Sequence, residues 1–141
     1  MAGSRAPGDG MKRLDPSALG LAALIGGAGV MHFVRPEFFD AIVPDWMPGS
    51  KRTVTLVSGG VELAGAALVI APRTRRIGAW WCLATFVGVF PANIQSALEG
   101  GIADAPPPFN TKAAAWGRLP LQAPMILWAR SVARAAKARK A

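Results

Sequence analysis

The sequence predicts an all-α membrane protein, a transmembrane four-helix bundle with antiparallel up-down topology. Three observations lead to this fold class: long apolar stretches, few charged residues, and a separation of charged from apolar segments. Hydrophobic residues make up 52% of the 141 residues and charged residues only 17%, whereas soluble domains average about 25% charged residues. Because the net charge is nevertheless +8, the basic residues must be concentrated in a few segments.

Four apolar stretches are long enough to cross a bilayer. A helix of about 20 residues rises about 30 Å, which matches the hydrocarbon thickness of a membrane. Four such helices in so short a chain leave too little polar surface for a soluble fold. The predicted spans are residues 17–34, 53–71, 77–98 and 113–129.

The remaining segments complete the predicted domain organisation. Residues 1–16 are polar and are predicted to be a disordered tail, residues 17–130 the membrane domain, and residues 131–141 a basic C-terminal tail. The first span follows Lys12 and Arg13 as a signal peptide would, but it is long and lacks a cleavage site, so we expect an uncleaved helix. The segment 35–50 mixes apolar and acidic residues with prolines, which indicates a short amphipathic segment in the membrane interface.

The basic residues predict the orientation in the membrane. Most of them fall on one side if both termini are cytoplasmic, as the positive-inside rule requires in a bacterial inner membrane. Because the basic tail directly follows a span, it is predicted to attract anionic lipid and not nucleic acid. Two pairs of small residues at four-residue spacing, Ala23 with Gly27 and Gly60 with Ala64, are predicted to let helices pack closely.

Polar side chains inside the spans gather at one depth, in the outer half of the membrane or near its midplane. Such groups are costly in lipid and need partners. Because all four helices contribute at this level, the side chains could converge on one polar pocket. We expect Glu62 to pair with Arg118, the cation within its reach. The candidate site residues are His32, Ser58, Glu62, Asn93, Arg118 and Gln122.

Several interpretations of this cluster remain open. The groups could simply satisfy one another and fix helix register, or they could line a ligand pocket. A proton relay through His32 and Glu62 is a further alternative. A metal site is disfavoured because these two residues are too few ligands. The single Cys82 lies in an apolar stretch, which is typical of packing and not of redox chemistry.

Five short motifs resemble the DoxX-like family of small bacterial membrane proteins. They run in order through all four predicted spans, over roughly residues 20–130, with departures at Met47 and Ser96. The resemblance implies a four-helix membrane bundle and, through the family's namesake subunit of a thiosulfate:quinone oxidoreductase, a link to membrane redox complexes. It assigns no catalytic residue. The motifs are His32-Phe33-x-x-Pro36 with Ile42-Val43-Pro44-x-x-x-Pro48, then Ser58-Gly59-x-x-Glu62-Leu63, Pro72-Arg73-Thr74-Arg75-Arg76, Phe90-Pro91-Ala92-Asn93-Ile94 and Arg118-Leu119-Pro120-Leu121-Gln122.

The sequence leaves three candidate functions open. The first is a membrane subunit that binds a lipophilic small molecule, with a quinone as the candidate cofactor, and that partners a redox enzyme. The second is a structural or anchoring module without ligand or catalysis. The third, ranked last, is a membrane enzyme that would use Glu62 and His32 as acid and base, a small set for catalysis. The bilayer itself is the partner that all three share.

Overall fold

The computed structural model describes residues 15–138, and within this range every regular element is a helix and there is no strand. The predicted all-helical class is confirmed. Four helices are long and one is short. The bounds of the first three long helices agree closely with the predicted spans, whereas the last long helix continues to Ala138, beyond the predicted end at residue 129. In chain order the helices are α1 (Pro16–Val34), α2 (Pro36–Asp40), α3 (Lys51–Ile70), α4 (Arg75–Leu98) and α5 (Lys112–Ala138).

The helix ends follow from local chemistry. Asp15 precedes Pro16 and its side chain accepts hydrogen bonds from backbone N–H groups of the first turn of α1. Ser50 does the same for α3 through the Thr53 N–H. At the other end of α3, the buried Arg75 side chain donates to the carbonyls of Val69 and Ile70, which have no partner within the helix. The short turn from α3 to α4 is thereby fixed.

The two predicted terminal tails lie only partly within the described residues. The proposed disordered tail, residues 1–16, lies outside the described residues except for Asp15 and Pro16, and Pro16 already belongs to α1. The proposed basic tail, residues 131–141, begins as helix, because α5 continues to Ala138. Residues 139–141 lie outside the described range.

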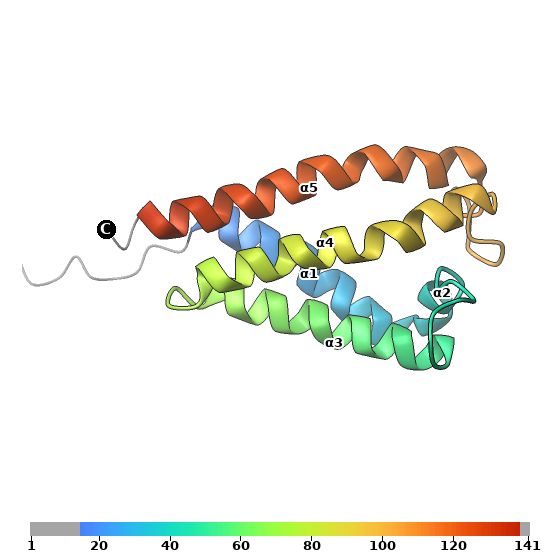
Figure 1. Ribbon diagram of the computed structural model, residues 1–141, viewed down its shortest axis with the longest axis horizontal. Coiled ribbons are helices and arrows are strands. Elements are labelled where there is room, and N and C mark those ends of the chain that lie inside the picture. Colours follow the sequence, from blue (N-terminus) through green and yellow to red (C-terminus); the bar gives the residue numbers. More distant parts are fainter. Residues whose placement is uncertain (1–14, 139–141) are drawn as a thin grey trace, which may run out of the picture.

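The long helices lie side by side along the long axis of the molecule (Figure 1). Helix α1 packs mainly on α3, α3 also packs on α4, and α4 packs on α5, whereas α1 touches α5 only slightly. The tight turn between α3 and α4 defines one end of the molecule, and α2 lies at the opposite end, which we call the α2 end. The apolar core occupies the part nearer the tight turn, where Leu21, Val69, Cys82 and Val132 are fully enclosed.

Close helix packing uses glycines other than those the sequence pattern indicated. Gly29 of α1 and Gly59 of α3 lie against one another, since a Cβ added at Gly59 would be 3.1 Å from the Gly29 carbonyl oxygen and 2.6 Å from the His32 Cβ. By contrast, Gly27 and Gly60 have nothing within 4 Å of such an added Cβ. The predicted small-residue packing pairs are therefore wrong: all four of their members, Ala23, Gly27, Gly60 and Ala64, are exposed.

Three of the long helices are long and apolar enough to cross a membrane: α1, α3 and α4. Their outward faces carry large apolar side chains that water would not solvate well, among them Val34, Val57 and Ile77, each about half or more exposed. Helix α5 covers the predicted fourth span but is not among the three helices that are apolar enough to cross. Its apolar sequence is interrupted by Arg118, Gln122 and two prolines.

Candidate functional site

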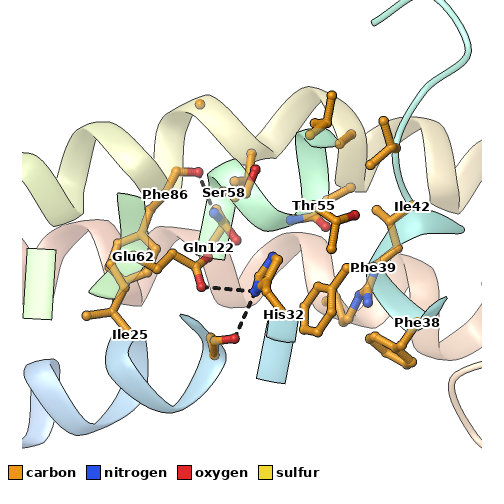
Figure 2. A pocket seen from close by; sticks show the side chains of 18 of the residues that line it. Ile25, His32, Phe38, Phe39, Ile42, Thr55, Ser58, Glu62, Phe86 and Gln122 are labelled. Atoms are coloured by element: carbon orange, nitrogen blue, oxygen red, sulfur yellow. Dashed lines mark hydrogen bonds and ion pairs between the residues drawn. The ribbon is translucent and has the colours of Figure 1, made fainter. Parts of the chain in front are cut away.

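A cavity of about 320 Å³ lies among the helices toward the α2 end (Figure 2). Side chains from all five helices and from the connection between α2 and α3 form its walls, which are mostly apolar. The six residues that the sequence placed at one depth all lie on these walls: His32, Ser58, Glu62, Asn93, Arg118 and Gln122. The structure thus brings the whole predicted set together, and the binding of a ligand by these residues stays a prediction.

Helix periodicity explains why these side chains point inward. Ser58 and Glu62 are four residues apart on α3, and Arg118 and Gln122 are four apart on α5, so each pair shares one face of its helix. Gln122 is buried, and its side-chain amide donates to the carbonyl of Phe86 on α4. This hydrogen bond fastens α5 to α4 at the cavity floor (Figure 2).

Glu62 is paired with His32 and not with Arg118, so the predicted Glu62–Arg118 ion pair is wrong. The His32 Nδ1 lies 3.4 Å from the Glu62 Oε2 and 2.8 Å from the Ala28 carbonyl oxygen (Figure 2). Since a carbonyl can only accept, Nδ1 carries a proton. The physical reason for the different partner is the packing of α1 on α3, which places the two side chains together, whereas α5 packs mainly on α4.

Arg118 is the most unusual group on the cavity wall. Its Nε and Nη2 atoms are shielded from the outside, and neither has a hydrogen-bond partner among the described residues. The Oε2 of Glu62 is likewise buried, and its 3.4 Å contact with the His32 Nδ1 is not a hydrogen bond. Buried polar groups are normally satisfied, so these atoms need a partner that the described residues do not supply.

The segment between α1 and α3 closes the cavity at the α2 end. Phe38, Phe39, Ile42 and Val43 line the cavity, so these apolar side chains face the helices, and the predicted position of the segment in the membrane interface stays a prediction. The Phe39 ring stacks on the His32 imidazole, with ring centroids 3.6 Å apart. We call residues 36–47 the cap.

Polar contacts hold the cap in place. The Arg52 guanidinium on α3 donates to Asp40 at 2.8 Å, and the Trp46 indole N–H donates to the side-chain oxygen of Gln95 on α4 at 2.8 Å. The Lys51 ammonium lies 2.7 Å from Asp45, and its hydrogen bond holds the pKa of that carboxyl below its ordinary value. These contacts connect the cap to both α3 and α4.

Gly88 on α4 is an exposed part of the cavity wall. Gly88 lines the cavity, is exposed, and has nothing within 4 Å of an added Cβ. Two tryptophan hydrogen bonds between α4 and its neighbours flank this position along the helix, from Trp81 to the Val61 carbonyl on α3 and from Trp46 of the cap to Gln95. An opening beside Gly88 would lie on the outward surface of apolar helices, where lipid would surround the protein.

Sequence reasoning missed Thr55. This residue is 1% exposed, lines the cavity, and its hydroxyl has no hydrogen-bond partner among the described residues. A signal was present, because Thr55 is three residues before Ser58 and seven before Glu62, which places all three on one face of α3.

The fold and the cavity together define a helical membrane protein with a polar cavity among its helices. The chain belongs to the family described as "Domain of unknown function (DUF8561)", whose model matches residues 21–133. No curated protein and no solved structure matches the chain. Nothing in these matches connects the chain with DoxX-like proteins, so that resemblance stays a prediction.

Proposed function

We propose that this protein binds a lipophilic small molecule in the cavity, with the polar head of the ligand among the six polar side chains. The observation that carries the proposal is the convergence of these side chains on one otherwise apolar cavity of about 320 Å³. That volume lies at the lower end of the range for small-molecule sites, about 300–1,000 Å³. A quinone, as the DoxX-like resemblance suggests, is a candidate of suitable kind: a small polar ring with an apolar tail.

The proposal includes a four-span membrane topology. We propose that α5 crosses the bilayer beside α1, α3 and α4, with both termini in the cytoplasm of a bacterial cell and the α2 end outside. The support is the basic residues near the tight turn and on the last turns of α5, Arg73, Arg76, Arg130 and Arg134. In this topology Arg118 and Gln122 of α5 would face the cavity, away from the acyl chains, as intramembrane polar groups normally do.

A structural module without a ligand is the second candidate, and two contacts favour it. The His32–Glu62 pair and the hydrogen bond from Gln122 to Phe86 are made within the protein. In this alternative the polar set only fixes the helices against one another. The two unpartnered donors of Arg118 argue against it, because a set selected for internal bonding would not leave them unsatisfied. A redox partner protein stays a prediction from the resemblance alone.

Native mass spectrometry of the gently solubilised full-length protein tests the proposal. We expect a lipophilic molecule to co-purify with the wild type and a quinone analogue to bind when it is added. Glu62→Gln should reduce this binding while the protein keeps its helical circular dichroism spectrum. The proposal fails if wild-type protein that is correctly folded carries no such molecule and takes up none of the lipophilic compounds offered.

A further inference from the structure

The cavity presents one edge of the Arg118 guanidinium as an unused pair of donors. Both Nε and Nη2 are buried and lack hydrogen-bond partners among residues 15–138. These two atoms carry parallel N–H groups on the same edge of the planar guanidinium. Arginine uses such parallel pairs to hold two oxygens of one carboxylate or phosphate group. The unused edge therefore matches an anionic head with two equivalent oxygens better than a single carbonyl oxygen.

The charges around the cavity favour the same kind of ligand. Within the described residues no carboxylate oxygen lies within 4.0 Å of the Arg118 guanidinium, and Glu62 is directed at His32. A cation in apolar surroundings is costly unless an anion is paired with it. A bound anion would supply this missing partner, whereas a neutral ring would leave the positive charge uncompensated.

The size and the opening of the cavity limit the rest of the ligand. About 320 Å³ accommodates a head group and the first part of an attached chain, and the walls near Leu24, Val89 and Met125 are apolar. A longer chain must leave the cavity. Beside Gly88 it can do so without displacing a side chain, since nothing lies within 4 Å of an added Cβ there.

We propose that the ligand is an anionic amphiphile with a single aliphatic chain, whose carboxylate or phosphate head accepts two hydrogen bonds from Nε and Nη2 of Arg118. This inference rests on the proposed function, because it presupposes that the cavity holds a lipophilic molecule. It goes beyond that function by assigning the charge of the head, the group that recognises it, and the side on which the chain leaves.

The test compares three ligands that share a palmitoyl chain and differ in head group, together with one neutral quinone. Full-length protein in neutral detergent is titrated with palmitate, methyl palmitate, palmitoyl lysophosphatidate and decylubiquinone, and bound ligand is measured by native mass spectrometry. We expect one of the two anionic ligands to bind about tenfold or more tightly than methyl palmitate, since charged hydrogen bonds are the stronger ones. The better of the two identifies the head as carboxylate or phosphate.

Variants locate the effect on Arg118. Arg118→Gln should remove the preference for the anionic ligand over methyl palmitate, while Arg130→Gln, an exposed arginine on the same helix outside the cavity, should retain it. Equal binding of palmitate, lysophosphatidate and methyl palmitate to the wild type overturns the inference, and so does an unchanged preference in folded Arg118→Gln. Because the wild-type comparison needs no variant, the test stands even if Arg118→Gln fails to fold.

The remaining outcomes separate this inference from the proposed function. If decylubiquinone binds and neither anionic ligand does, the cavity is a lipophilic site with a neutral ligand, and only the inference falls. If none of the four compounds binds to folded wild-type protein, the proposed function falls as well.

Discussion

His32 and Glu62 face one another from α1 and α3, with the imidazole Nδ1 3.4 Å from the carboxylate Oε2. The backbone contact that allows this lies one turn away, where Gly29 meets Gly59. Because neither glycine has a side chain, the two helices approach closely enough for the imidazole of His32 and the carboxylate of Glu62 to share one wall of the cavity. The site therefore depends on a packing contact between two residues that do not line the cavity.

A methyl group at Gly59 should disrupt this arrangement. The added Cβ would lie 2.6 Å from the His32 Cβ and 2.8 Å from the Phe33 ring, distances that force the helices apart. We expect Gly59→Ala to lower the free energy of unfolding by about 1–3 kcal/mol, the usual cost of overpacking. Thermal unfolding in detergent measures the effect.

The adjacent glycine provides the control. Gly60 is exposed and has nothing within 4 Å of an added Cβ, so Gly60→Ala should leave the unfolding temperature unchanged or raise it through the greater helix propensity of alanine. Equal destabilisation by both substitutions would mean that the contact between Gly29 and Gly59 does not set the helix spacing.

The cap should open more often when its bond to α4 is removed. The Trp46 indole N–H donates to Gln95 at 2.8 Å, and phenylalanine keeps an aromatic ring but no donor. For a bond worth about 0.5–1.5 kcal/mol we expect Trp46→Phe to increase amide hydrogen exchange in residues 41–47 roughly twofold to tenfold. Exchange detected by mass spectrometry reports this region directly.

Trp116→Phe is the matched control for the cap. Trp116 is 45% exposed and lies on α5 outside the cavity wall. Its replacement should leave exchange in residues 41–47 as in the wild type. If Trp46→Phe behaves in the same way, the indole bond does not restrain the cap, and Phe39 stacked on His32 is the contact to examine next.

The sequence predicted the helices and the residues of the candidate site more fully than their pairings. Hydropathy gives each helix independently, and depth along a helix follows from its rise per residue. Both kinds of information are local, so Ser58, Glu62, Arg118 and Gln122 could be placed at one level before any packing was known. That level became one cavity because the helices enclose a common interior, which all five of them line.

The contact between particular residues needed information that no single helix contains. Glu62 meets His32 because α1 packs on α3, and the sequence offers glycines on several faces of both helices; the pairs at Gly27 and Gly60 were as plausible as the real contact between Gly29 and Gly59. For the cap, an amphipathic pattern shows that one face seeks an apolar surface but not whether that surface is lipid or a cavity wall. In the structure, the side chains of Phe38 and Phe39 line the cavity.

The membrane topology can be tested with single cysteines, because the native Cys82 is fully buried. In a Cys82→Ser background, Asn110→Cys places a thiol between α4 and α5, and Ala135→Cys places one near the end of α5, both at exposed positions. If α5 crosses the bilayer and both termini are cytoplasmic, a membrane-impermeant maleimide should label Asn110→Cys in intact bacteria and Ala135→Cys only after permeabilisation. Labelling of both in intact cells would show that α5 does not cross, and the reverse pattern would invert the proposed orientation.

The exposed part of the cavity wall at Gly88 gives a prediction about ligand access. The Cβ of a leucine at Gly88 would have nothing within 4 Å, so we expect Gly88→Leu to fold normally and to reduce co-purified or added ligand several-fold by blocking the path of its chain. Gly60→Leu is the matched control, since it adds the same side chain to an exposed helical glycine that does not line the cavity. Native mass spectrometry compares the occupancy of both variants with that of the wild type.

Leu24 on α1 also lines the cavity and is 42% exposed. Leu24→Trp therefore tests the alternative path for the ligand. If this substitution blocks binding and Gly88→Leu does not, ligands pass beside α1, and the assignment of the opening to α4 is wrong.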